Sequence, residues 1–454
     1  MRGAATRWLP KETRESQPAY DSRLKRSILY GALKDTLDNA TAKPFAQPIT
    51  LPDIPLHEKL EKIEGNADRN GQDLTSFGAE AFKAALAYGL THAIVDYPAA
   101  KTDDEGNTTD RSVQDERDED IRPYFVHVPP TALIGFRSET LPSGDKKILM
   151  ARIKSEEEVP DGEYGEKTVY RITVWTDTDV SIHESDTGKE GSYKEQSRTS
   201  HTYGEVPLET LYIERTGHLT GAPPFEDLAW LNIAHWQSFS DQRNILRIAR
   251  VPIIVAAGFT NDEIGENFSV SSSRFVRTKN PEASIKHVEH TGKAIAAGEE
   301  DLKRLEERMV MLGLQPFVQR SGSQTATGKA IDESRTHTAI QAWIRECEGF
   351  IHNLYKAAAR WIDSELPEKF AVSINSDFGF ALNGTDDIAN LLKARLAGEL
   401  SRATFLHELK RRGLLAEGVV IDDEVAAIEA EGPEPEDADI PALRDGDGDG
   451  NTNE

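Results

Sequence analysis

The stretch that decides the fold reads Phe225-Glu-Asp-Leu-Ala-Trp-Leu-Asn-Ile-Ala-His-Trp-Gln-Ser-Phe-Ser-Asp-Gln-Arg-Asn-Ile-Leu-Arg-Ile-Ala-Arg250. Pro223 and Pro224 stand before it and Pro252 stands behind it, and proline ends regular structure. Its large apolar residues cover more than one face of a helix: Leu228, Leu231, Ile233, Trp236, Phe239, Ile245, Leu246 and Ile248. A helix that is apolar on several sides must be packed on several sides. We therefore predict one long helix with more than one partner.

Two more helical patterns follow this stretch. Residues 253–290 contain strand-like segments around a short turn or helix at 261–266. An amphipathic helix is expected from Lys293 to about Leu312, and a third long helix from about Ala326 to Ile362. The small polar segment Ser321-Gly-Ser-Gln-Thr-Ala-Thr-Gly328 between them predicts a flexible loop. A rod, a tip, a returning rod and a loop in this order are typical of a ring subunit built around a channel.

The part of the chain before this stretch combines helices and strands. A helical pattern over Leu74–Tyr88 leads into an apolar strand at Ala93–Tyr97, and another helical pattern lies near Tyr20–Asn39. Residues 121–215 alternate as antiparallel strands do, with a hairpin expected at Asp186–Gly188. The sequence therefore predicts an α+β protein.

Charged and terminal segments complete the expected organisation. Residues 101–120 hold nine acidic and three basic residues without an apolar period, and they predict a solvated loop. After the third long helix we expect a strand over Lys369–Phe378 and two short helices, Thr385–Leu400 and Ser401–Arg412. Residues 419–454 contain thirteen acidic residues and one Arg, so we expect a disordered acidic tail.

Composition limits the class of protein. The 454 residues carry a formal net charge of −25, and 38% of them are hydrophobic, which is enough to bury ordinary cores. The longest apolar run, Val251–Phe259, is too short to cross a bilayer, and residues 1–11 lack the apolar core of a signal peptide, so neither membrane insertion nor secretion is expected. The single cysteine, Cys347, excludes an intrachain disulfide and favours a reduced, cytoplasmic setting. A chain this acidic is not expected to wrap nucleic acid, since phosphate binding relies on Lys and Arg.

No pattern in the chain is typical of an enzyme active site. Gly322–Lys329 invites comparison with a phosphate-binding loop, but five residues rather than four separate its glycines, and Ala330 replaces the required Ser or Thr. Asp445–Gly450 matches only the first half of a calcium loop, because the twelfth-position Glu does not follow. His287 and Glu289 share one face of an expected strand, which brings together two metal ligands at most. We predict no catalytic residue, no metal site and no cofactor.

Arg243, Arg247 and Arg250 recur at helical spacing and form one basic stripe on the first long helix. Two interpretations stay open. The guanidinium groups could pair with carboxylates of a neighbouring helix or subunit, a role for which Arg is well suited. Alternatively, they could line a channel and touch nucleic-acid phosphates in passing.

Six segments, taken in order, carry a family resemblance. The most specific is Pro223–Asn244, and the other five are Arg7–Thr13, Gly89–Pro98, Gly292–Ala296, Met309–Gly313 and Thr325–Gly328. On these segments the chain resembles the portal proteins of tailed double-stranded DNA bacteriophages, and the resemblance covers roughly residues 7–415. It looks like a branch of portals that was first recorded as a family of unknown function.

The resemblance implies an elongated portal-type subunit that assembles as a ring, with a β-rich wing, a helical stem and a small α/β clip. Carried onto this chain, it assigns a wing at 1–222 with a wing strand at 365–382, a stem helix at 223–250, a clip at 251–291, a second stem or wing helix at 292–313, a tunnel loop at 314–328, a long helix at 329–364, a short helical crown at 383–418 and the acidic tail at 419–454.

The resemblance also implies a function and a set of partners. Portal proteins form a dodecameric ring at one capsid vertex, the channel for genome packaging and ejection. The partners would be other copies of the chain, the major capsid protein, the scaffolding protein, the terminase large subunit and the head-tail adaptor. Double-stranded DNA would pass through without sequence specificity, and the location would be the virion, after assembly in the host cytoplasm. The tunnel-loop residues that would line the narrowest aperture are Gln319, Arg320, Ser321, Gly322, Ser323 and Gln324.

Two alternatives from other classes remain. A capsid-associated head-tail adaptor or scaffold-like structural protein would share some helices, and so would a carboxylate-dependent nucleic-acid enzyme using Asp177 or Asp179. A large ring would favour the portal, whereas divalent-metal-dependent nuclease activity that is lost on changing either aspartate would favour the enzyme.

Overall fold

The computed structural model describes residues 6–98, 113–249, 253–259, 280–288, 293–313, 326–376, 385–411, 414–415 and 419–431. The chain divides into two compact units, Met1–Ser376 and Asp377–Glu454. Helices and antiparallel sheets occur together, which confirms the predicted α+β class.

A three-stranded antiparallel sheet forms the centre of the first unit. Its order is β2 (Tyr124–Val128), β1 (Leu90–Asp96) and β8 (Leu208–Tyr212). Helix α5 (Leu74–Tyr88) buries Phe77 and Phe82 beside the sheet, and the Asp73 carboxylate caps its first turn by accepting a hydrogen bond from Ser76 N–H at 2.6 Å. β1 is buried along nearly its whole length, including the polar residues Thr91 and His92, whose side chains hydrogen-bond to His127 and Thr210.

Gly89 joins α5 to β1 in the left-handed conformation, with φ of 85°. A Cβ at this position would overlap the backbone of Ala222, the residue just before the two prolines that precede α7. The Gly89 carbonyl also accepts a hydrogen bond from Ile213 N–H at 3.0 Å. Only glycine fits both the conformation and the close approach, so this turn ties the sheet to the start of the long helix.

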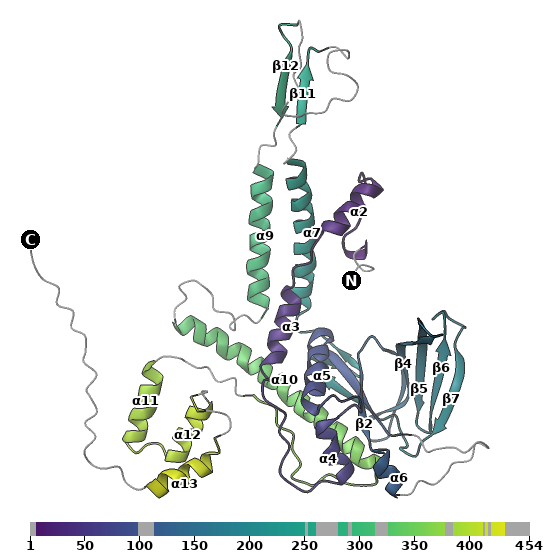
Figure 1. Cartoon of the computed structure of the whole chain (residues 1–454), viewed down its shortest axis with the longest axis vertical. Coiled ribbons are helices and arrows are strands. Elements are labelled where there is room, and N and C mark those ends of the chain that lie inside the picture. Colours follow the sequence, from purple (N-terminus) through teal and green to yellow (C-terminus); the bar gives the residue numbers. More distant parts are fainter. Residues whose placement is uncertain are drawn as a thin grey trace, which may run out of the picture. The chain divides into compact units, whose positions relative to one another are not determined.

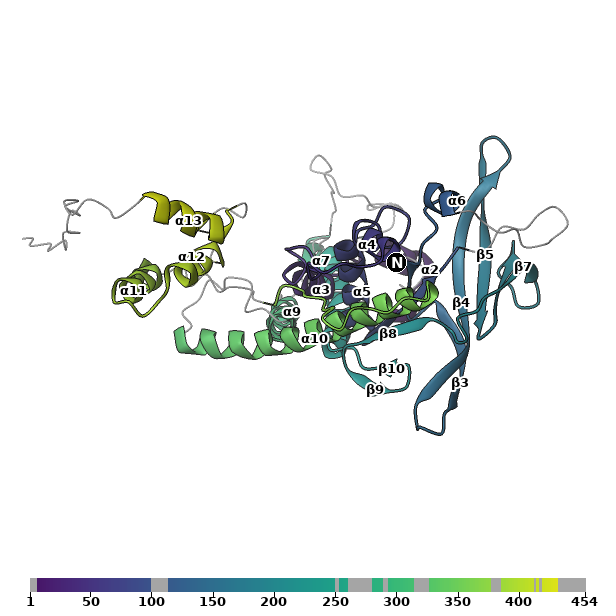
Figure 2. The same ribbon diagram turned by 90° about the horizontal axis from the view of Figure 1, so that it is seen from below.

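A five-stranded antiparallel meander lies beside the central sheet (Figure 2). Ile94 and Leu208 of the central sheet share one buried cluster with Ala151 and Trp175 of the meander. β7 is exposed at every residue and polar throughout, which protects this edge from pairing with other strands. The strands of the meander are β3 (Leu133–Thr140), β4 (Lys146–Asp161), β5 (Gly165–Thr176), β6 (Asp179–Ser185) and β7 (Lys194–Ser200). The short pair β9 (Arg215–Gly217) and β10 (Thr220–Gly221) follows.

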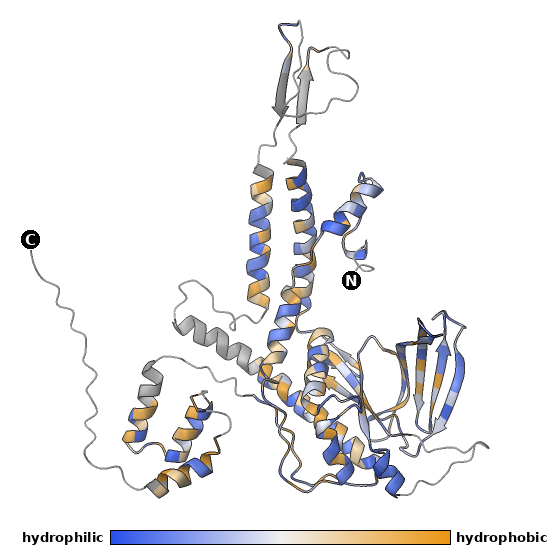
Figure 3. Cartoon of the chain, viewed as in Figure 1, coloured by the Kyte–Doolittle hydropathy of each residue, from blue (hydrophilic) through white to orange (hydrophobic). Residues whose placement is uncertain are grey.

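The helix expected at about 225–250 is α7 (Glu226–Ala249), which lies against α9 (Lys293–Leu312) (Figure 1). The chain between them pairs β11 (Ile253–Ala257) with β12 (Ser284–Val288) as an antiparallel ribbon. Figure 3 shows hydrophilic and hydrophobic residues interspersed along both helices. A third long helix, α10 (Ala326–Trp361), packs on β8 and β1, and the Trp361 indole N–H donates to the Val95 carbonyl at 2.8 Å.

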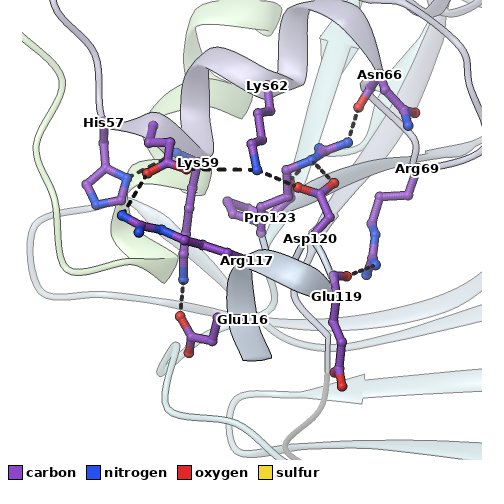
Figure 4. Close-up of polar contacts among 12 residues, drawn as sticks. His57, Lys59, Lys62, Asn66, Arg69, Glu116, Arg117, Glu119, Asp120 and Pro123 are labelled. Carbon is purple, nitrogen blue, oxygen red and sulfur yellow. Dashed lines mark hydrogen bonds and ion pairs between the residues drawn. The ribbon is translucent and has the colours of Figure 1, made fainter. Parts of the chain in front are cut away.

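A cluster of ion pairs fastens α6 (Val113–Asp118) to α4 (Glu58–Gly65), as Figure 4 shows. Lys59 binds Glu116 at 2.7 Å and Lys62 binds Asp120 at 3.0 Å. Arg122 is 1% exposed, and its guanidinium donates to Asp120 and to the Asn66 carbonyl. The segment 101–120 was expected to be a solvated loop, which is wrong for its last residues, because basic partners from distant positions make a helix there.

Two other local expectations are wrong. The helical stretch at Tyr20–Asn39 is two helices, α2 (Gln17–Arg26) and α3 (Ala32–Ala42). Tertiary hydrogen bonds fix the break between them, because the Asn232 side chain accepts from Leu33 N–H and donates to the Tyr30 carbonyl.

The described part of the expected strand Lys369–Phe378, residues 369–376, forms only an isolated bridge between Ser373 and Thr50. Phe370, Val372 and Ile374 are buried alternately, as the pattern indicated, but the bridge joins them to no named strand.

The second unit contains three helices among the residues described. Leu406 and Ile421 are buried in it, while Leu396 is 78% exposed. Helix α13 lies inside the segment that was expected to be wholly disordered, so that expectation is wrong for 421–431. The helices are α11 (Thr385–Leu396), α12 (Arg402–Arg411) and α13 (Ile421–Glu431).

Glu209 on β8 gives the fold a testable pH dependence. Burial and the Glu205 carboxylate raise its pKa to about 7, against the opposing effect of Lys356. Between its ordinary value of 4.5 and about 7, the unfolded chain has released this proton while the folded chain still holds it, so stability falls as pH rises through that window.

We expect Glu209→Gln to raise the free energy of unfolding by up to about 3 kcal/mol at pH 8 and to change it little at pH 5. Thermal unfolding at both pH values measures the difference. Glu139→Gln, at an exposed position on β3, is the control. An equal gain in the free energy of unfolding at both pH values would contradict the raised pKa of Glu209.

Candidate functional site

The seam between α7 and α9 is held by directed polar contacts. The Ser238 hydroxyl donates to the Asp301 carboxylate at 3.0 Å, and the Gln242 amide donates to the Ile295 carbonyl at 2.8 Å. The His235 ring lies 3.2 Å from the Glu306 carboxylate. His235 and Gln242 are 3% and 5% exposed, so these two side chains are withdrawn from water, whereas the Ser238–Asp301 bond lies at the exposed edge of the seam.

Gly298 allows the two helices to approach each other at this seam. A Cβ at position 298 would overlap the Gln242 side-chain amide, with the Gln242 Cδ only 2.9 Å away. The Gln242 side chain cannot move aside without giving up its bond to Ile295, and it is buried. The glycine therefore sets the spacing of the helix pair.

The other side of α7 contacts the N-terminal segment through a second set of polar bonds. The Ser27 hydroxyl donates to the Ser240 hydroxyl at 2.8 Å, and the Gln237 amide donates to the Trp8 carbonyl at 2.7 Å. Ser240 is two residues from both Ser238 and Gln242, which is about 200° around a helix axis. Helix α7 thus lies between α9 and the N-terminal segment, and polar side chains on two opposite faces of α7 hydrogen-bond to these two neighbours.

A cavity of about 300 Å³ opens between α2 and α7. Four arginines converge on it, two from each helix. We call it the arginine cavity, and its lining residues are Arg23, Arg26, Ser27, Ser240, Arg243, Asn244, Leu246 and Arg247.

The four guanidinium groups are not equally neutralised. Arg23 is buried and binds Glu15 at 2.8 Å, and this hydrogen bond lowers the pKa of the Glu15 carboxyl and raises that of Arg23. Arg26, Arg243 and Arg247 are exposed, and no carboxylate within the described ranges lies in ion-pair distance of them. Arg243 lies over the Phe239 ring, 5.9 Å from its centroid. Three positive charges in the cavity therefore remain available to an anionic group.

The structure locates only part of the site predicted from the sequence. Arg243 and Arg247 lie together at the arginine cavity, whereas Arg250 falls outside the described residues. The tunnel-loop residues 319–324 also fall outside them. For Arg243 and Arg247, pairing with carboxylates of a neighbouring helix is not observed within the described part of the chain.

Sequence reasoning missed Arg23 and Arg26. They lie more than 200 positions before their α7 neighbours, and no local pattern marks them as part of one site. Their placement depends on the bonds of Ser27 and Asn232, which only the folded chain reveals.

Other candidate sites are already satisfied by neighbouring groups. A second cavity, of about 400 Å³, is lined by the α4–α6 ion-pair cluster, where cations and carboxylates bind one another. Asp179 binds Arg198 at 2.6 Å. Cys347 is buried, and burial raises the pKa of its thiol.

The described residues contain neither a cluster of metal ligands nor a membrane span. Among these residues, no three His, Cys, Asp or Glu side chains gather as a metal site would require. No helix in the same part of the chain has both the length and the apolar character of a membrane span.

Comparison with known proteins gives one family and several structures. A family model described as a domain of unknown function (DUF4055) matches residues 224–362, from the start of α7 to the end of α10. No curated protein matches the chain.

Three solved structures are similar at low identity. The virion of a native gene transfer agent particle gives 11% identity and a TM-score of 0.40, over 88% of this chain and 96% of that one. The neck of an empty gene transfer agent particle, computed with C6 symmetry, gives 10% identity and a TM-score of 0.44, over 87% of this chain and 94% of that one. The neck of a native gene transfer agent particle, computed with C12 symmetry, gives 12% identity and a TM-score of 0.39, over 85% of this chain and 89% of that one.

Gly298→Ala tests the helix seam. We expect a loss of about 1–3 kcal/mol in the free energy of unfolding, because the added methyl overlaps a fixed side chain. The matched control is Gly349→Ala in α10, where a Cβ meets nothing within 4 Å and the better helix propensity should stabilise by up to about 1 kcal/mol. Chemical denaturation measures the free energy of unfolding of both variants. Equal values for the two would show that α7 and α9 lie further apart at Gly298 than the structure places them.

Proposed function

We propose that this chain is the portal subunit of a tailed bacteriophage particle, a structural protein that forms a dodecameric ring at one capsid vertex. The ring is the channel for genome packaging and ejection, and it docks the terminase large subunit and then the head-tail adaptor. The observation that carries this proposal is the α7–α9 pair, an antiparallel helix pair connected through a β ribbon, in which several large apolar side chains stay exposed or half-buried although Asn232, His235 and Gln242 are buried.

Exposed apolar side chains gather at this helix pair and at the α2–α3 connection beside it. Trp230 is 52% exposed, Met311 71% and Ile28 66%. On α7 itself the apolar residues from Leu231 to Leu246 are only half-buried, whereas Asn232, His235 and Gln242 are buried. Apolar surface of this extent on a soluble chain marks a protein interface, and neighbouring copies in a ring would cover it.

The proposal assigns each region of the ring to elements of the fold. In the proposal α7 and α9 form the stem, the β11–β12 ribbon belongs to the clip, and the two sheets of the first unit form the wing that meets the major capsid and scaffolding proteins. The helices of the second unit form the crown. The proposed tunnel loop at 314–328 includes the first three residues of α10, and in the proposal its residues 319–324 line the narrowest aperture.

Net charge supports passage of DNA rather than tight binding. A subunit with a formal charge of −25, repeated around a ring, repels phosphates and lets a duplex slide without sequence specificity. In this proposal the protein acts in the virion, after assembly in the host cytoplasm.

The purified protein should form closed rings of twelve subunits. Negative-stain microscopy would show the central hole, and mass photometry would give about twelve times the subunit mass of 50.3 kDa. A monodisperse, stable monomer whose α7 amides are strongly protected from hydrogen exchange would refute the proposal, since the apolar side chains would then need no neighbour.

Deletion of Ser321–Gln324 tests the role of the loop. We expect rings to form as in the wild type, while packaging or retention of the genome is disturbed, because this segment would contact DNA at the aperture. Particle yield and encapsidated DNA measure the effect, with ring formation as the internal control. Loss of the rings themselves would mean that the segment is a folding element and not a channel loop.

A further inference from the structure

The arginine cavity can accept an anionic partner from outside the subunit. Three of its four arginines have no carboxylate partner within the described residues, and like charges held together repel one another. Helix α9 carries a run of acidic residues, Glu299–Asp301, yet it lies on the opposite side of α7. Its carboxylates therefore cannot turn to neutralise the cavity of their own chain.

We propose that the arginine cavity of one subunit binds Glu299 and Glu300 of α9 in the adjacent copy. This inference rests on the ring of the proposed function and names the contact that closes it. A ring needs a heterologous interface, in which one face of a subunit meets a different face of the next. The helix pair offers two such faces, a basic one between α2 and α7 and, on α9, the exposed acidic pair Glu299–Glu300.

The register of the two helices places these groups within about two helical turns of one another along the pair. Ser238 is bonded to Asp301 and Gln242 to Ile295, so Ser240, which lines the arginine cavity, is level with the residues between 295 and 301, while Arg243 and Arg247 lie about one and two turns further toward the β11–β12 ribbon. Side chains on a helix lean toward its N-terminus, so the arginines of α7 lean back toward Ser240 and the glutamates of α9 lean toward the ribbon. Rotation about an axis that runs along the helix pair leaves every residue at its own height. Glu299 and Glu300 are therefore the carboxylates of α9 in the next copy that come nearest in height to the arginines.

Both carboxylates are available for such a contact. Glu299 and Glu300 are exposed, and the only ion pair of Glu300 within the described residues is to Arg304, four positions along the same helix. An exposed pair of this kind is weak, so it yields readily to a better partner. The planar guanidinium groups of Arg243 and Arg247 suit carboxylates in particular, since Arg binds them through two parallel hydrogen bonds.

Reversal of charge on one face at a time tests the contact. We expect Arg243→Glu with Arg247→Glu to reduce the fraction of protein in rings at least tenfold in mass photometry, and Glu299→Arg with Glu300→Arg to do the same. The control, Lys189→Glu with Lys194→Glu on the exposed edge of the five-stranded sheet, makes the same change in charge and should leave the rings intact. Circular dichroism checks that each variant is folded.

Mixing the two variants gives the decisive result. Each reversed arginine face then meets a reversed glutamate face, so an equimolar mixture should form rings of alternating subunits while each variant alone does not. Rings from the Arg243/Arg247 variant alone at the wild-type level would overturn the proposal. A mixture that stays dissociated would also overturn it, and binding of a short DNA duplex that is lost with the arginines would then identify phosphate as the occupant.

A wild-type protein that forms no rings would be a different outcome. It would remove the proposed ring itself and this contact with it. The failure of the function and the failure of the contact are thus told apart by the wild-type sample.

Discussion

The buried polar contacts of α7 are the constraint on which the rest of the structure depends. Asn232 fixes the break between α2 and α3, Ser240 holds α2, and Gln242 holds α9. Hydrogen bonds of this kind are directional, and a buried donor or acceptor that loses its partner is costly. They therefore fix the position of α7 between two neighbours while the apolar side chains of the helix remain partly exposed.

Because polar bonds position the helix, a stable subunit can leave apolar surface exposed for assembly. The sheets and α10 form an apolar core in which Phe77, Trp175 and Tyr355 are buried. The helix pair has no comparable core of its own, since the largest buried apolar residues of the first unit lie elsewhere. In a ring, contact between copies would add the missing apolar burial, and the polar bonds would keep the helix pair in the conformation that the contact requires.

The chain is acidic on average, but positive charges gather at the α4–α6 ion pairs and at the arginine cavity. Ion pairs at α4 and α6 neutralise cations and carboxylates within the subunit, and they hold a segment that follows a run of acidic residues. The arginine cavity is different because three of its cations lack a partner in the described part of the subunit. An uncompensated cluster in an acidic protein favours contact with a carboxylate surface, and a second copy of the same chain supplies one at high local concentration.

The sequence by itself determined the α+β class, the long helices α7, α9 and α10, and the basic stripe at Arg243 and Arg247, because helical periodicity and proline punctuation are local signals. Only the tertiary structure decided that α2 and α3 are separate helices, that residues 369–376 form an isolated bridge and not a strand, and that Arg23 and Arg26 complete the cavity. The physical reason is the same in each case. These features depend on bonds between residues far apart in the chain, such as Ser27 with Ser240, and no local pattern records such a bond.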